Sequence, residues 1–259
     1  MAEGHRRNWA IVGASRDITA AVLVIGDEIL SGRTKDKNIA VIAERMTDIG
    51  IRLKEVRVVA DDEAEIVGAV NALRARYTYV FTTGGIGPTH DDITADSIAK
   101  AFGVAIDVDP RARALMQAAC EARGVELTEA RLRMARLPAG SELVENAISI
   151  APGFMLGNVI VMAGIPDIMR VMLDAVTPRL ETGARVLSET IALDKPESQI
   201  ASLFAGHQAL YPDIAMGSYP CMRDGRPATD LVLRGTDPAR LQAALRELKV
   251  KLGLPIAVG

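Results

Sequence analysis

From Thr19 onward the chain alternates short apolar runs with longer amphipathic segments. Residues 20–25 and 77–83 are rich in β-branched and aromatic residues and predict strands. Residues 38–46 repeat their apolar positions at helical spacing, and Gly50 is suited to end that helix. This alternation is typical of parallel strands joined by crossover helices, so the pattern predicts an α/β fold.

The same reasoning predicts the other elements of the first 180 residues. We expect a strand over 51–59, helices over 63–76, 92–102, 110–123, 128–136 and 166–180, and a hairpin over 154–163 that turns at Gly157. Asp61 or Asp62 is expected to cap the helix that starts at Glu63.

The pattern changes near residues 181–184. Beyond that point it predicts strand 185–193, helix 197–210, strands 214–219 and 229–233, and helix 237–252. Such a β-α-β-β-α unit can form its own sheet. We therefore expect a large domain over 19–183 and a small α+β domain over 184–259, preceded by a loosely ordered extension over 1–18.

The amino-acid composition limits the kinds of partner that we expect this protein to bind. The chain has 259 residues, 49% of them hydrophobic, which supports a well-buried core. Its 30 Lys and Arg against 33 Asp and Glu form no long charged block, and only 3% of residues are aromatic, so nucleic acid is not an expected partner. The two cysteines are far apart, and no stretch has the apolar length of a membrane span or a signal peptide. We expect a cytoplasmic protein that binds a small molecule and not a membrane.

The most informative window is residues 81–94, with the sequence FTTGGIGPTHDDIT. It lies between a predicted strand and a predicted helix, where ligands bind in open α/β sheets. Gly84, Gly85 and Gly87 would let backbone N–H groups approach a phosphate closely. The adjacent Asp91 and Asp92 would repel that phosphate unless a divalent cation neutralised them, so the window predicts a metal-assisted phosphate site.

A plainer interpretation remains open from these residues alone. The glycines can form only a tight turn, and one of the two aspartates can merely cap the following helix. Two other phosphate motifs do not fit: His90 stands where a dinucleotide fingerprint needs its third glycine, and residues 26–34 have one residue too many for a P-loop, with Arg33 in place of its lysine.

Six motifs in order give the chain a family resemblance over residues 20–180. They are IGDEILSG at 25–32, DKN at 36–38, VADD at 59–62, the window TTGGIGPTHDDIT at 82–94, APGF at 151–154 and AGIP at 163–166. With them the chain resembles the MoaB/Mog molybdopterin-binding family, and most closely the amino-terminal domain of CinA-type, competence/damage-inducible proteins. It departs from the family at Ser149 and Ala163, where glycine and proline are common, and residues 185–259 are too short for the amidase domain of full-length CinA-type proteins.

The resemblance implies a three-layer α/β domain with a mostly parallel sheet, often oligomeric, that holds a pterin or nucleotide phosphate and a divalent metal at the glycine turn. We therefore expect a homo-oligomer. CinA-type relatives resemble metal-dependent pyrophosphatases that split ADP-ribose, FAD or similar dinucleotides. Adenylyl transfer to molybdopterin, and pterin or nucleotide binding without turnover, stay open as alternatives.

Motif positions in the family assign roles to residues of this chain. Asp92 and Asp61 are expected to be catalytic, and Asp92 and Asp91 to bind Mg²⁺, with Mn²⁺ or Co²⁺ as alternatives. The residues expected to contact substrate are Gly84, Gly85, Gly87, Pro88, Thr89, Asp27, Glu28, Ser31, Gly153 and Gly164. For Asp27 and Glu28 the alternative is a plain loop carboxylate, and for Gly153 and Gly164 a purely geometric role in a turn.

Overall fold

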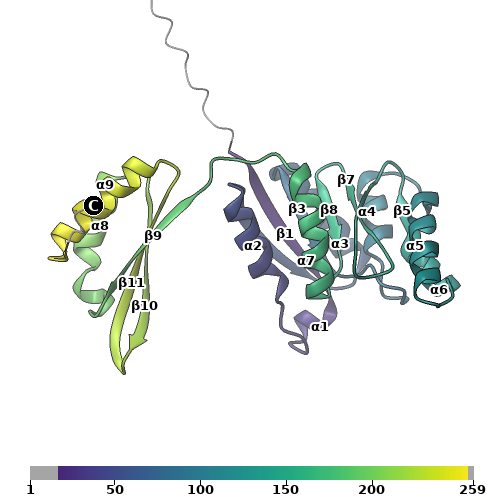
Figure 1. Ribbon diagram of the computed structural model, residues 1–259, viewed down its shortest axis with the longest axis horizontal. Helices are drawn as coiled ribbons and strands as arrows, with labels where there is room; N and C mark the ends of the chain where they lie inside the picture. The colour runs from purple at the N-terminus through teal and green to yellow at the C-terminus, as the bar shows by residue number, and fades with distance from the viewer. Residues whose placement is uncertain (1–16, 256–259) are drawn as a thin grey trace, which may run out of the picture. The chain divides into compact units, whose positions relative to one another are not determined.

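The computed structural model describes residues 17–255 and divides into two compact units between Gly183 and Ala184. Residues 1–16 of the predicted extension lie outside the described residues. Each unit has its own hydrophobic core (Figure 1).

The first unit contains eight strands and seven α-helices among its described residues. The strands are β1 (Thr19–Ile25), β2 (Arg52–Val59), β3 (Tyr79–Thr83), β4 (Ile106–Val108), β5 (Arg136–Pro138), β6 (Glu142–Val144), β7 (Gly153–Leu156) and β8 (Val159–Met162). The helices are α1 (Asp27–Leu30), α2 (Asn38–Asp48), α3 (Glu63–Arg76), α4 (Thr94–Phe102), α5 (Pro110–Ala122), α6 (Glu129–Leu132) and α7 (Pro166–Val176), with 3₁₀ turns η1 (Arg133–Ala135) and η2 (Thr177–Arg179).

Six of these strands form one sheet in the order β2-β1-β3-β8-β7-β6. The pairs β1–β2, β1–β3 and β3–β8 are parallel, while β7 is antiparallel to both β8 and β6. Helices α3 and α4 cover one face of the sheet, and α2 and α7 cover the other (Figure 1). The predicted three-layer α/β class with a mostly parallel sheet is thus confirmed.

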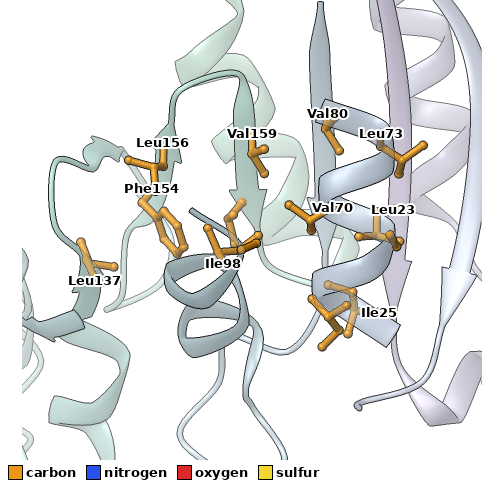
Figure 2. Packing of buried hydrophobic residues seen from close by; sticks show 14 of the residues in the cluster. Leu23, Ile25, Val70, Leu73, Val80, Ile98, Leu137, Phe154, Leu156 and Val159 are labelled. Carbon is orange, nitrogen blue, oxygen red and sulfur yellow. The ribbon is translucent and has the colours of Figure 1, made fainter. Parts of the chain in front are cut away.

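The two faces are filled by alternate residues of the same strands. Leu23 and Ile25 of β1 pack with Val70 and Leu73 of α3, as Figure 2 shows. Val22 of β1 faces the opposite layer, together with residues of α2 and α7. Because both faces are buried, β1 and β3 are almost continuously apolar, as expected of central parallel strands.

Parallel pairing brings four loops to one edge of this sheet. The loops that follow β2, β1, β3 and β8 all leave from the carboxyl ends of their strands, at the edge where open α/β sheets bind ligands. They carry Asp61, Asp27, Gly84 and Gly164, respectively.

Several element boundaries differ from the sequence prediction, including those of three helices in the first unit and of residues 201–210, 215–223 and 226–235 in the second, which were predicted as 197–210, 214–219 and 229–233. Helix α4 begins at Thr94 and not at Asp92, because the Asp92 carboxylate accepts hydrogen bonds from Thr89 and holds residues 89–92 in a turn. The helix expected over 128–136 ends early, since Arg136 begins β5, which pairs with β4. These two strands have three residues each, too few for a recognisable alternation. Helix α7 ends at Val176, ahead of Pro178.

The second unit has the predicted β-α-β-β-α order. Its elements are β9 (Leu187–Leu193), a 3₁₀ turn η3 (Glu197–Gln199), α8 (Ala201–Leu210), β10 (Ala215–Arg223), β11 (Arg226–Gly235) and α9 (Pro238–Lys251). The strands form an antiparallel sheet in the order β10-β11-β9, and α8 and α9 pack on it through a separate core. In residues 17–255 no helix has both the length and the apolar character needed to cross a membrane.

The cap of α3 is settled in favour of Asp62, whose carboxylate accepts a hydrogen bond of 3.1 Å from the Glu65 N–H. Replacing Asp62 with alanine should lower the free energy of unfolding by about 1 kcal/mol, because this N–H loses its partner. Urea unfolding followed by circular dichroism measures the loss. Asp62→Asn is the matched control, since asparagine caps equally well, and an alanine variant as stable as the control would contradict the assignment.

Candidate active site

Gly84 and Gly85 form a turn directly after β3. Gly84 has φ of +106°, and a Cβ there would lie 2.1 Å from the Ile25 carbonyl oxygen at the end of β1. Gly85 has φ of +65°, and a Cβ there would lie 2.2 Å from the Thr94 hydroxyl oxygen. Side chains would therefore clash at both positions in conformations that already favour glycine. The close approach observed here is to the protein's own Ile25 and Thr94, and approach of the N–H groups to a phosphate stays a prediction.

Thr94 fixes the direction in which the turn leaves the sheet. Its hydroxyl donates to the Gly84 carbonyl oxygen at 3.0 Å, and its N–H donates to the Gly85 carbonyl oxygen at 3.0 Å. With both carbonyls bound, the Gly85–Gly87 segment directs its N–H groups away from the sheet: within residues 17–255, the N–H groups of Gly85, Ile86 and Gly87 donate to no protein acceptor. Thr94 belongs to the motif at residues 82–94, but the sequence alone assigned no role to it.

Asp61 connects the loops after β1, β2 and β3. Its Oδ2 accepts a hydrogen bond of 2.9 Å from the Asp27 N–H, and its Oδ1 lies 3.6 Å from the place of a Cβ on Gly85. Burial raises the pKa of the Asp61 carboxyl, the hydrogen bond from Asp27 opposes this, and the charges of Glu28, Asp27 and Asp91 raise it further. Asp61 is therefore a carboxylate whose charge the surrounding protein leaves uncompensated.

Asp92 and Asp91 lie on the outer part of the turn. The Asp92 Oδ2 accepts from the Thr89 N–H at 2.9 Å and from the Thr89 hydroxyl at 2.5 Å, and it lies where a Cβ on Gly87 would be only 2.6 Å away. Asp91 is exposed, and the Thr89 hydroxyl lowers the pKa of its carboxyl. Ile93 occupies the N-cap position of α4, so neither aspartate caps that helix.

The carboxylates do not form a complete metal cage. In the described part of the chain, no group of three or more His, Cys, Asp or Glu side chains is arranged to hold a metal ion. A cation held at this edge would take one or two carboxylates from the protein and the rest of its ligands from water or substrate, which is the usual binding mode of Mg²⁺.

Two pockets flank the glycine turn. The first, which we call the Arg133 pocket, is lined by the Gly85–Gly87 segment, Asp92, Arg133, Arg136 and apolar residues that include Phe154. The second, which we call the Asn38 pocket, is lined by Glu28, Lys35, Lys37, Asn38, Thr83 and Gly164, among others. A ligand that crosses the turn would have one end in each pocket.

The structure gathers most of the predicted site residues at this edge, but not all of them. Ser31 lies at the exposed carboxyl end of α1 and lines neither pocket, and Pro88 and Thr89 are exposed on the outer turn. Gly153 is buried, and a Cβ there would lie 2.5 Å from the Val161 carbonyl oxygen, so its place is explained by the packing of β7 on β8. Gly164 does line the Asn38 pocket.

Several polar residues of the two pockets had no predicted role in substrate binding, among them Lys35, Lys37, Thr83, Arg133 and Arg136. At the start of α2 the Asp36 carboxylate accepts from the N–H groups of Asn38 and Ile39, so the Asn38 side chain does not cap this helix. The DKN motif at residues 36–38 had marked the segment that contains Lys37 and Asn38. No local pattern pointed to Arg133 or Arg136, which reach the turn through the folding of α6 and β5.

Comparison with known proteins supports the family resemblance and adds a second match. Residues 21–182 match the family described as "Probable molybdopterin binding domain", and residues 185–258 match that described as "FAD synthase, middle domain". A crystal structure titled "The crystal structure of the protein CinA with unknown function from Thermoplasma acidophilum" superposes with a TM-score of 0.58 and 34% identity, covering 62% of this chain and 96% of that one.

Two curated relatives extend over both units or most of them. A CinA-like protein of Desulfosudis oleivorans is 35% identical over 209 residues, 76% of this chain and 51% of that protein. A probable FAD synthase of Caenorhabditis elegans is 29% identical over 255 residues, 89% of this chain and 49% of that protein. The chain thus spans about half the length of each of these two relatives.

The electrostatics of Asp61 predict a pH-dependent stability. A raised pKa means that the folded state holds the proton more tightly than the unfolded state, so stability falls as pH rises from the ordinary value of 3.8 through the raised one. Asp61→Asn removes this charge and should stabilise the protein at neutral pH by up to about 1 kcal/mol, with no gain at pH values below the ordinary pKa. Urea unfolding across this pH range in chelator measures the difference. A destabilised variant at neutral pH would contradict the prediction.

Proposed function

This chain belongs to the molybdopterin-binding domain family, with a CinA-like first unit, and on that premise we propose that it hydrolyses the phosphoanhydride of a dinucleotide such as ADP-ribose or FAD with the help of a divalent cation. The observation that carries the proposal is the glycine turn between two pockets. A dinucleotide has two bulky ends joined by a diphosphate, and this arrangement suits such a molecule lying across the turn.

The Gly85–Gly87 segment supports binding of the diphosphate. Its N–H groups have no acceptor within residues 17–255, and the amino end of α4 follows directly. Arg136 is held by Asp96 at 2.7 Å, whereas Arg133 is exposed and makes no ion pair with the described residues. Arg133 is therefore the arginine of this pocket that remains available to a phosphate.

The carboxylates fit a divalent cation shared with the substrate. Burial and the neighbouring carboxylates raise the pKa of Asp61 despite the hydrogen bond from the Asp27 N–H, which supports a cation beside it, and the Asp92 Oδ1 is left over when Oδ2 binds Thr89. Asp61 and Asp92, with Asp91 nearby, would hold the cation, which when bound supplies charge neutralisation at the phosphates. Asp61 would also orient the attacking water, whose proton passes to solvent.

The proposed reaction is a simple displacement. A water oxygen attacks one phosphorus of the diphosphate, the bond from that phosphorus to the bridging oxygen breaks, and the two nucleotide halves leave as phosphate monoesters. Asp61 orients the water, while the N–H groups of the glycine turn and Arg133 stabilise the negative charge on the phosphate oxygens.

Nucleotidyl transfer is the second candidate, and the match of residues 185–258 favours it. Here the phosphate of a pterin or of FMN would attack ATP, AMP would be transferred, and pyrophosphate would leave. The name of the Caenorhabditis elegans relative points to the same chemistry, with FAD as the product. Hydrolysis is preferred because two pockets on either side of one turn suit a substrate that already has two ends.

A product assay tests the proposal. With Mg²⁺, Mn²⁺ or Co²⁺ the protein should release AMP from ADP-ribose or FAD, and chelator should abolish the release. Asp61→Asn and Asp92→Asn should each lower kcat by roughly 100-fold or more, because a water-orienting or cation-binding carboxylate is lost. Asp62→Asn, which keeps the cap of α3, is the matched control and should remain active.

The same assay separates the alternatives. Pyrophosphate released from ATP together with FAD formed from FMN, or with an adenylylated pterin, would replace hydrolysis by transfer. Tight binding of the dinucleotides without any product would contradict both reactions.

A further inference from the structure

The Asn38 pocket contains two buried polar atoms that no protein group satisfies. Asn38 is 3% exposed and Thr83 is 1% exposed, and both line this pocket. Neither the Asn38 Oδ1 nor the Thr83 Oγ1 has a hydrogen-bond partner. A single unsatisfied buried group costs free energy, so two of them beside the same pocket point to a ligand that supplies the missing partners.

The orientation of the Asn38 amide determines what that partner must be. The Gly164 carbonyl can only accept, and it receives a hydrogen bond of 2.8 Å from the Asn38 Nδ2. The Asn38 Oδ1 is thereby fixed as the atom left over, and it needs a donor. A phosphate oxygen without a proton cannot donate, whereas a sugar hydroxyl or a ring N–H can. The Thr83 hydroxyl can either donate or accept.

The exposed part of the same pocket favours a negatively charged group, unlike its buried end. Lys35 and Lys37 line it, both are exposed, and neither makes an ion pair with any described residue. Two available ammonium groups suit a phosphate. Glu28 and Asp36 also line the pocket, but the Asp36 Oδ1 is engaged by the Asn38 and Ile39 N–H groups. The pocket thus combines a rim with two available ammonium groups and a buried end that requires a hydrogen-bond donor.

We propose that the Asn38 pocket binds one nucleotide half of the substrate, with its phosphate at Lys35 and Lys37 and a sugar hydroxyl or base N–H donating to the Asn38 Oδ1 beside the Thr83 hydroxyl. The part of this proposal that places the other half of the substrate across the glycine turn rests on the proposed function. Binding of a mononucleotide to this pocket requires no hydrolysis, so the two proposals can fail separately.

Thr83→Val is the decisive variant. Valine has the shape of threonine, suits a β-strand, and removes a hydroxyl that makes no hydrogen bond in the protein, so the fold should be preserved. Thr82→Val is the matched control: Thr82 is fully buried in the same strand and its hydroxyl also has no partner, but it belongs to the alternate face and does not line the Asn38 pocket.

Titration calorimetry in chelator, with AMP and with inorganic pyrophosphate as probes, measures the effect. Thr83→Val should weaken AMP binding roughly three- to tenfold, as expected for one lost hydrogen bond, and leave pyrophosphate binding unchanged. Thr82→Val should change neither. Lys35→Met should weaken both probes, because both carry phosphate.

Two further probes identify the donor. Ribose 5-phosphate carries hydroxyls without a base, and 2′,3′-dideoxy-AMP carries the base without the vicinal hydroxyls. Sensitivity of the first probe to Thr83→Val assigns the group bound at the Thr83 hydroxyl, and hence the part of the ligand beside Asn38, to the sugar, and sensitivity of the second assigns it to the base. The proposal is overturned if the wild type binds AMP no better than pyrophosphate, or if the two valine variants affect AMP binding equally. Failure of the dinucleotide assay alone would instead remove the proposed function.

Discussion

The close approach of three strand ends at Gly84 is the constraint on which the site depends. A Cβ on Gly84 would lie 2.1 Å from the Ile25 carbonyl oxygen, and a Cβ on Gly164 would lie 3.3 Å from the Gly84 Cα. The ends of β1, β3 and β8 can therefore meet with only backbone between them. This contact brings the Arg133 pocket and the Asn38 pocket to opposite sides of one turn, and it holds Asp61 against that turn through the Asp27 N–H.

The site gains its chemistry at the expense of local stability. Asp61 carries a charge that burial and neighbouring carboxylates disfavour, and Asn38 and Thr83 each keep a buried polar atom without a partner. Unfavourable features of this kind are common in functional sites, because a ligand or cation relieves them on binding. Their concentration at the carboxyl edge of the sheet is the strongest physical argument that this edge binds a cation and a ligand with hydrogen-bond donors.

In the second unit, the polar residues of the hairpin serve the fold of that unit. Its hairpin arginine Arg223 is bound by Asp194 at 2.8 Å and Asp230 at 2.7 Å. Asp224 and Gly225 both have positive φ and form the tight turn of that hairpin. Residues 185–258 match the family described as "FAD synthase, middle domain". The Arg133 pocket and the Asn38 pocket are both lined by residues of the first unit.

The sequence by itself determined the features that depend on neighbouring residues. Alternation of apolar runs predicted most strands and helices of both units, but not the short elements α1, β4, β5 and β6. The glycines at 84, 85 and 87 marked the turn, because a residue without a Cβ allows positive φ and close approach. Motif order then identified the family. The positions of Asp61, Asp91 and Asp92 in these motifs also made them candidate site residues.

Only the tertiary structure decided which of several similar residues does which work. Asp61 and Asp62 are adjacent and chemically identical, yet one faces the Gly84–Gly85 turn and the other caps α3. Arg133 and Arg136 reach the turn from nearly fifty residues away, and Asn38 is oriented by a carbonyl 126 residues distant in the chain. Burial, an unsatisfied lone pair and a repelled charge are properties of the packed surroundings, and these arise only when distant segments are brought together.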